Sequence, residues 1–402
     1  MGSGLRLGLG LQRLGVSKVS VRAGSDMIEG PSSALPASPR RRHPVLVAVL
    51  SVLGGLVLAA TLAGFVIHLP YVIISPGSAT PLDNRIVVIH GADTDSRLHR
   101  GSFRFLTVTV STHDPNLWRL LSAWLDSDQD IEDRTSVVGC LNDADNFTYN
   151  TELMQQSQNT ARSVALTRLG YSVHADTPAV RVVEVCPGVP AYGMLHTGDT
   201  VRAVDGRAVE NRSAVAALVR AHHPGDPIDV TFDHDGASRN ARITAGRITV
   251  GGTKCVPAGH ETSGTACLGI ASFDLVSYQF PIDVSINTQR VSGPSAGLAF
   301  ALAIIDDLTP GDLTGGKEVA VTGTIEPDGS VGAVGGVEQK AITARTNHVA
   351  LMIVPTAEVA DARRGAGNVP VVGVATLEDA LGALRHAGGA EVPPPSSTVV
   401  RS

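Results

Sequence analysis

The feature of this chain that most limits its folding is an uncharged run of 23 residues, Val45 to Ile67. As a helix, the run would be about 34 Å long, which is enough to cross the hydrocarbon core of a bilayer. Arg40, Arg41 and Arg42 stand directly before it. Because arginines beside a span stay in the cytoplasm, we expect the residues after the run on the extracytoplasmic side.

A cleaved signal peptide is the alternative to a transmembrane helix at 45–67, but its apolar core is usually only about 7–15 residues long. A buried helix of a soluble protein is a third, weaker interpretation. Residues 1–44 are rich in Gly, Ser, Ala and Pro without lasting apolar periodicity, which predicts a disordered cytoplasmic tail. Met27 is a second candidate start of the chain beside Met1. We therefore expect a single-pass protein of the cell membrane.

The charge distribution argues against one class of partner. The chain has 402 residues, more than one typical domain, and a formal net charge of −6. Residues 1–43 are themselves basic, so the remainder is more acidic than the total suggests. No nucleic-acid-binding surface is predicted.

A serine follows a Gly-Pro pair at the start of a predicted helix, in the sequence Gly293-Pro294-Ser295-Ala296-Gly297. The helix is apolar on every side, which is typical of a helix enclosed by protein. Pro294 suits a position before or within the first turn, and the glycines allow close backbone approach, so N–H groups would face an oxyanion beside Ser295. A serine that only caps the helix is the alternative.

A lysine, Lys340, falls on the apolar face of another predicted helix, together with Val337 and Ala344. Burial lowers the pKa of an ammonium group, so this lysine could deprotonate a serine. The chain has only four lysines against 28 arginines, and arginine cannot act as a base. A lysine that snorkels to solvent is the alternative.

Three motifs resemble the proteolytic domain of the Lon family: GPSAG at 293–297, VTGTI at 321–325 and GGVEQKAITA at 335–344. The order of predicted elements agrees as well, from an extended segment at 281–286 to a strand at 350–355. Several short motifs in the right order are more specific than any one of them.

The resemblance implies a serine-lysine dyad in which Ser295 is the nucleophile and Lys340 the general base. It also implies that Thr322 hydrogen-bonds the lysine amine. The chain departs from the family at Ser292, where an acidic residue is common, and at 283–287, where a histidine-containing strand is usual. Substrate contacts of that strand are therefore not carried over.

Residues 171–247 resemble a PDZ domain, most clearly in the sequences AYGML at 191–195 and GDTV at 198–201. Such domains bind an extended peptide by adding it as a strand to a sheet edge. The predicted groove combines a helix at 213–222 with the segment that precedes the first strand, and a purely structural sheet module is the alternative. The groove residues assigned to that segment are Leu169, Gly170, Tyr171, Ser172 and Val173.

Between the apolar run and the PDZ-like region, residues 71–170 show two strand patterns followed by two helices, the first expected to begin at Asp114. We predict a small α+β juxtamembrane unit without visible chemistry. Its tryptophans, Trp118 and Trp124, are expected in the core of that unit, and contact with the membrane surface is the alternative.

Four cysteines follow the apolar run, where disulfides can persist. Cys255 with Cys267 is the favoured pair because the segment between them has the composition of a loop. The remaining Cys140 and Cys186 could then pair. No CxxC spacing is present and His260 alone completes no site, so no metal is expected.

Two other catalytic motifs are weaker. Residues 311–318 almost spell a phosphate-binding loop, but Glu318 replaces the Ser or Thr that would hold magnesium. A serine-histidine-aspartate triad would need His348 or His260, and neither lies in a recognisable motif. No cofactor is therefore expected.

The expected fold class is α/β and α+β multidomain: one transmembrane helix, a PDZ-like domain, a Lon-type α/β proteolytic domain at 265–388 and a disordered tail at 391–402. The expected function is an ATP-independent, membrane-anchored serine endopeptidase that cleaves unfolded or exposed extracytoplasmic segments. The alternatives are a catalytically silent PDZ-based binding or scaffolding protein, and a protease that cleaves only itself. Expected partners are protein or peptide substrates and membrane lipid, and homo-oligomerisation stays open.

Overall fold

The computed structural model describes residues 44–90, 100–111, 113–248, 254–261, 263–288 and 291–393. The predicted cytoplasmic tail with its arginines, the alternative start Met27 and most of the predicted C-terminal tail lie outside these residues. The chain divides into two compact units, residues 1–58 and 59–402. The described part of the first unit is helical throughout.

Helix α1 (Pro44–Val66) corresponds to the apolar run. Within the described residues it is the one helix long and apolar enough to cross a membrane, and its mean hydropathy reaches 2.6. By length and composition, α1 therefore meets the requirements of a transmembrane span.

A six-stranded sheet with the order β19-β18-β15-β3-β1-β4 forms the centre of the α/β domain. Its first four strands are parallel, and β1 and β4 run antiparallel to their neighbours. The strands are β1 (Tyr71–Pro81), β3 (Ser102–Val110), β4 (Asp130–Asp133), β15 (Glu318–Val321), β18 (Leu351–Pro355) and β19 (Val371–Val374).

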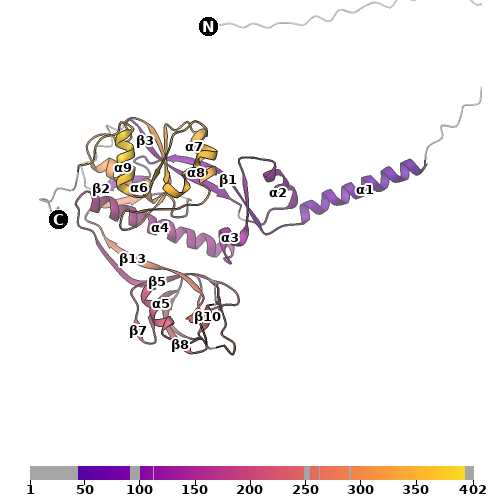
Figure 1. Ribbon diagram of the computed structural model, residues 1–402, viewed down its shortest axis with the longest axis horizontal. Helices are drawn as coiled ribbons and strands as arrows, with labels where there is room; N and C mark the ends of the chain where they lie inside the picture. Colours follow the sequence, from indigo (N-terminus) through magenta and orange to yellow (C-terminus); the bar gives the residue numbers. More distant parts are fainter. Residues whose placement is uncertain are drawn as a thin grey trace, which may run out of the picture. The chain divides into compact units, whose positions relative to one another are not determined.

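Helices cover both faces of this sheet, as Figure 1 shows. Val319 and Val321 of β15 face the core that contains α6, whereas Ala320 between them faces the core that contains α7 and α8. Because helices cover both faces, β18 is buried at every position. Strands buried on both faces have continuous apolar sequences, as β18 does. The helices on the first face are α4 (Asp143–Arg168), α6 (Gly297–Leu308) and α9 (Leu377–His386), and those on the second are α7 (Val337–Thr346) and α8 (Val359–Ala366).

The predicted separate juxtamembrane unit at 71–170 is wrong. Strand β3 hydrogen-bonds in parallel to β15, and α4 packs against α6, so both belong to the same α/β domain as the serine and lysine motifs. A strand pattern reveals that a segment will pair but not with which strand, because the partner is chosen by tertiary packing.

Helix α2 (Leu117–Trp124) begins later than predicted, because Asn116 rather than Asp114 caps it by accepting a hydrogen bond from the Arg119 N–H group. The prediction that both tryptophans lie in the core is also wrong. Trp124 is 74% exposed and Trp118 36% exposed, since Leu120 and Ala123 occupy the buried face instead.

The PDZ-like region forms a second sheet with the order β13-β5-β6-β8-β9, and β7 also pairs with β6. Its edge strand β13 lies outside the predicted boundaries 171–247 and was expected to belong to the proteolytic domain. It pairs with β5 along almost its whole length. The elements are β5 (His174–Val185), β6 (Thr200–Val204), β7 (Arg207–Ala208), α5 (Arg212–Arg220), β8 (Pro227–His234), β9 (Ala237–Thr244) and β13 (Ile270–Gln279).

Both disulfides follow the pairing that the sequence favoured, Cys140–Cys186 and Cys255–Cys267. The first joins the segment before α4 to the end of β5, and the second joins β11 to β12. The remaining elements are short: β2 (Val87–His90), α3 (Arg134–Val138), β10 (Gly246–Ile248), β11 (Cys255–Val256), β12 (Thr265–Cys267), β14 (Asp283–Ile286), β16 (Thr324–Ile325), β17 (Val331–Gly332) and the 3-10 helix η2 (Thr356–Glu358).

Candidate active site

Ser295 lies in the turn that leads into α6, and its side chain is half-buried. The Ser295 carbonyl oxygen accepts a hydrogen bond from the Gly323 N–H group at 2.9 Å, and the Leu298 N–H group donates to the Gly323 carbonyl oxygen at 3.1 Å. The turn is thereby tied to the segment that follows β15.

Helix α4 holds the same turn from its other side. The Gly293 N–H group donates to the Asn150 carbonyl oxygen, and the Ser157 hydroxyl donates to the Pro294 carbonyl oxygen, each at 2.8 Å. Gly293 has a φ of 93°, a left-handed conformation that glycine adopts without strain. The motif is therefore held by backbone groups on two sides.

The backbone at the serine offers free donors. The N–H groups of Ser295 and Ala296 donate to no residue within the described part of the chain. They stand at the N-terminal end of α6, where the helix dipole favours negative charge. These two groups are candidates for stabilising an oxyanion, as the sequence predicts.

Lys340 lies on α7 and is only 2% exposed. Its Nζ donates to Thr322 Oγ1 at 3.2 Å, and Thr322 Oγ1 in turn donates to the Ser295 carbonyl oxygen at 3.3 Å. Thr322 is fully buried between them. Among the described residues, no hydrogen bond joins the Ser295 hydroxyl to Lys340 directly, so Thr322 provides the link between the two.

Burial lowers the pKa of Lys340 from 10.5 to about 8, because an ammonium group loses solvation in the core. The Glu358 carboxylate acts in the opposite direction and raises the pKa of Lys340. Burial is the stronger effect. The neutral amine of Lys340 is therefore a minor form at pH 7 and becomes the major form as the pH rises above about 8.

Glu358 is a residue that sequence reasoning missed. It ends η2, just after β18, and its Oε1 accepts a hydrogen bond from the Val334 N–H group at 2.8 Å. Burial raises the pKa of Glu358, while the charge of Lys340 lowers it. Its Oε2 is buried without a hydrogen-bond partner among the described residues. The sequence gives no local signal for this residue, because its relation to Lys340 exists only after β18 and α7 pack together.

A pocket of about 310 Å³ reaches Ser292, three residues before Ser295. One wall comes from α4, including the exposed Phe147, and the other from the chain between β14 and the serine turn. Its lining is partly polar, with Gln155 and Gln158 on the α4 side. Through Val291 and Ser292, this pocket adjoins the segment that leads into the serine turn.

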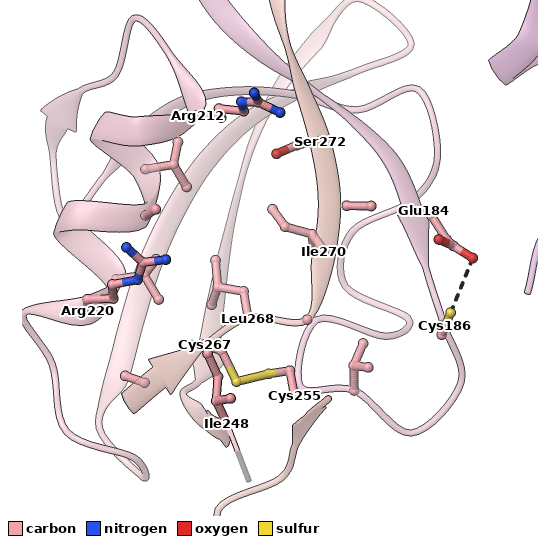
Figure 2. A pocket seen from close by; sticks show the side chains of 17 residues that line it. Glu184, Cys186, Arg212, Arg220, Ile248, Cys255, Cys267, Leu268, Ile270 and Ser272 are labelled. Atoms are coloured by element: carbon pink, nitrogen blue, oxygen red, sulfur yellow. Dashed lines mark hydrogen bonds between the residues drawn. A yellow bond between two sulfur atoms is a disulfide. The ribbon is translucent and has the colours of Figure 1, made fainter. Parts of the chain in front are cut away.

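A second pocket, of about 400 Å³, lies between α5 and β13 in the PDZ-like region. Figure 2 shows Arg212 and Arg220 toward opposite ends of α5, with Leu268 and Ile270 facing the space between them. The Cys255–Cys267 disulfide closes one end. Because β13 is an edge strand, it has an unpaired side to which an extended peptide could add.

The predicted groove segment is wrong, although the predicted helix is part of the pocket. Leu169 caps the C-terminal end of α4, and residues 170–173 connect α4 to β5 without lining the pocket. The strand beside α5 instead comes from about 100 residues later in the chain. That placement depends on strand order in the sheet, which the local pattern does not reveal.

Two groups of side chains have the composition of a metal site in the described residues. Cys140, Glu184 and Cys186 are one group, but both cysteines are used in a disulfide. The other is His196, Asp199 and His234, in which the buried Asp199 carboxylate already accepts hydrogen bonds from the His196 N–H group and His234 Nδ1. Neither group lies in the serine-lysine site.

Comparison with known families identifies two separate domains in the chain. Residues 279–370 match the Lon protease (S16) C-terminal proteolytic domain, and residues 167–245 match the PDZ domain. The first match includes Ser295, Thr322 and Lys340.

Two curated Lon proteases are similar to this part of the chain. The Archaeal Lon protease of Methanocaldococcus jannaschii is 31% identical over 121 residues, which cover 29% of this chain and 18% of that protein. Lon protease 1 of Herpetosiphon aurantiacus is 36% identical over 84 residues, covering 21% of this chain and 10% of that protein. The chain thus spans less than a fifth of either relative.

Solved structures similar to this chain include two PDZ domains. Those of the SdrC-like proteins from Listeria innocua and Listeria monocytogenes are each 24% identical, with a TM-score of 0.20. They cover 23% and 24% of this chain, and the matches span 92% and 87% of those structures.

The site and the surrounding α/β layers define a proteolytic domain of the Lon type. With the PDZ domain, it gives this chain the domain composition of a PDZ-containing Lon-like protein.

Proposed function

We propose that this protein is a membrane-anchored serine endopeptidase that acts outside the cytoplasm without ATP. The observation that carries the proposal is the buried Lys340, whose pKa is about 8 and whose amine is hydrogen-bonded to Thr322. Thr322 also contacts the carbonyl oxygen of Ser295, so nucleophile and base share one positioning residue.

In the proposed mechanism, the neutral amine of Lys340 takes the hydroxyl proton of Ser295 as its oxygen attacks the peptide carbonyl carbon. The N–H groups of Ser295 and Ala296 stabilise the negative charge that develops on the carbonyl oxygen. The protonated lysine then gives its proton to the leaving amine. Water activated by Lys340 hydrolyses the acyl-enzyme and frees Ser295.

The two disulfides support an extracytoplasmic position for both domains, because structural disulfides are rare in reducing cytoplasm. The arginines before α1 favour the same orientation. ATP independence is supported at Glu318, the residue that breaks the phosphate-loop pattern. Glu318 begins β15 and accepts hydrogen bonds from Ser102 and Arg104, so it has a structural role there.

The α5–β13 pocket supports peptide recognition by the PDZ domain. Its apolar centre, from Leu268 and Ile270, suits an apolar side chain, and Arg212 and Arg220 favour an acidic group or a terminal carboxylate. We propose that substrates bind there as an added strand before an unfolded segment reaches Ser295.

The experiment compares the full chain in detergent or vesicles with its Ser295→Ala and Lys340→Ala variants on unfolded casein across pH 6–10. Lys254→Ala is the matched control, because Lys254 is an exposed lysine in a connecting segment outside the α/β domain. We expect both site variants to lose at least about 1000-fold in kcat/KM and the control to retain activity. Equal cleavage by all four proteins would contradict the proposed dyad.

A PDZ-based binding protein with a silent protease domain is the second candidate. It is favoured by the absence, among the described residues, of a direct hydrogen bond between the Ser295 hydroxyl and Lys340. Peptide binding that requires the α5–β13 pocket, together with no hydrolysis by the unaltered chain on any peptide that binds, would support this candidate instead.

A further inference from the structure

Helix α2 carries an exposed apolar face that nothing in the described protein covers. Its buried side, with Leu120 and Ala123, packs on Ile73 of β1. Its only basic residue is Arg119. The exposed apolar side chains are Leu117 at 43%, Trp118 at 36%, Leu121 at 42%, Trp124 at 74% and Leu125, which follows the helix, at 72%.

This face is continuous with the last turns of α1. Trp118 Nε1 donates to the Thr61 carbonyl oxygen at 2.9 Å, and the rings of Trp118 and Phe65 lie 6.4 Å apart. Gly64 is needed for this approach, since a Cβ atom there would collide with the Trp118 indole. Figure 1 draws α2 beside the end of α1.

Backbone bonds fix the same arrangement. The Leu117 N–H group donates to the Ile67 carbonyl oxygen at 3.2 Å, and the Leu69 N–H group to the Pro115 carbonyl oxygen at 3.1 Å. The start of α2 is therefore attached to the residues that leave α1. If α1 crosses a bilayer, Trp118 lies against its lipid-buried or headgroup-level turns.

We propose that α2 lies in the outer interface of the bilayer, with Leu121, Trp124 and Leu125 among the headgroups and upper acyl chains. This inference rests on the proposed membrane span. Lipid is the occupant because the apolar surface of α1 needs lipid and α2 extends that surface without a break. An amphipathic helix with tryptophan on its apolar side is typical of this position.

Helix α2 is linked to one edge of the six-stranded sheet. Strand β4 follows α2 and forms the edge of the six-stranded sheet, and Ile131 of β4 contacts the same small core as Leu120. Insertion of α2 would hold this edge of the sheet at the membrane surface. The buried apolar area of α2 would drive its binding to the bilayer, since Arg119 alone provides little attraction to anionic lipid.

The test uses the tryptophans, because the chain has only two and both lie on α2. In the full chain with Trp118→Phe, Trp124 is the single reporter, and the phenylalanine preserves the ring beside Phe65. The chain is reconstituted into phosphatidylcholine vesicles brominated at shallow or deep acyl carbons. We expect shallow bromines to remove about half of the Trp124 emission and deep bromines to remove less. Added anionic lipid should change this quenching little.

A second variant adds Leu121→Gln and Leu125→Gln, and Ser122→Gln on an exposed polar position is its matched control. The double substitution should reduce quenching severalfold, and the control should not. Vesicle flotation after an alkaline wash is measured on the same samples and reports on α1 alone.

Three outcomes would overturn the proposal. A chain that fails to float would contradict the membrane span itself and this inference with it. A chain that floats while Trp124 is quenched by aqueous iodide and not by brominated lipid would overturn the α2 position only. A blue-shifted Trp124 that neither reagent quenches would place α2 against protein, such as a second copy of this chain.

Discussion

Lys340 shows how a single side chain acquires its chemistry from burial. At 2% exposure, it loses the solvation that normally keeps lysine charged, and its pKa falls to about 8. Glu358 limits this fall, because its charge stabilises the ammonium form. The pKa of the proposed base, Lys340, therefore results from two opposing effects, of which burial is the larger.

Replacing Glu358 tests this balance. Lys340 works as a base only when unprotonated, so kcat/KM should rise with pH as the amine loses its proton near pH 8. Glu358→Gln removes the charge that raises the pKa of Lys340, and the rise should then occur at lower pH. Glutamine keeps an oxygen that can accept from the Val334 N–H group.

The control for this experiment is Glu378→Gln on α9, an exposed glutamate paired with Arg168. Its pH profile should match that of the unaltered chain. A Glu358→Gln profile that does not move, or that moves to higher pH, would contradict the assigned role of Glu358.

At the scale of elements, α6 is the helix on which the site depends. It is buried from Gly297 to Asp306 and packs between the sheet and α4, so its position determines where Ser295 lies. The close approach of α4 requires a residue without a side chain at Gly297. A Cβ atom there would lie 2.7 Å from Ser157 Oγ and 2.9 Å from Ile325 Cγ2.

We expect Gly297→Ala to lower the free energy of unfolding by about 1–3 kcal/mol, because the added methyl group must displace Ser157 or Ile325. Activity should fall more steeply than stability, since the serine turn would move. Gly382→Ala in α9 is the matched control, because nothing lies within 4 Å of a Cβ atom at that position. This change should raise the free energy of unfolding by at most about 1 kcal/mol. Denaturant unfolding and kcat/KM measure both effects, and equal stabilities for the two variants would refute the crowding argument.

At the scale of the whole molecule, the Cys140–Cys186 disulfide connects the α/β domain to the PDZ sheet. It closes a stretch of 46 residues that contains α4, the helix that holds the serine turn. The Cys140 N–H group also donates to Glu184 of β5 at 2.7 Å. The disulfide thus couples the PDZ sheet to the helix that supports the candidate active site.

Removing this disulfide with Cys140→Ser and Cys186→Ser should lower the free energy of unfolding by about 2–4 kcal/mol. The double variant Cys255→Ser and Cys267→Ser is the comparison, because its disulfide closes only 12 residues and should contribute less to stability. Since the second disulfide closes one end of the α5–β13 pocket, its loss should weaken peptide binding more than stability. Calorimetry and peptide titration on both variants provide the check, and indistinguishable losses would contradict the separate roles.

The sequence alone determined the parts of the molecule that depend on neighbours along the chain. The apolar run at α1, the enclosed serine helix and the rare lysine on an apolar face are local patterns, and the structure contains all three helices. The capping box of α9 is likewise a local feature, because Thr376 and Asp379 form both its hydrogen bonds within one turn.

Only the tertiary structure decided which distant segments meet. It placed β3 beside β15, placed β13 next to α5 and left Trp124 exposed. It also brought the charge of Glu358 near enough to Lys340 to raise the pKa of that lysine. A strand or carboxylate finds its partner through the packing of the whole domain, so its own sequence does not record that partner. The local pattern therefore identified the candidate dyad, while long-range packing determined the groove, the counter-charge and the surface that faces the membrane in our proposal.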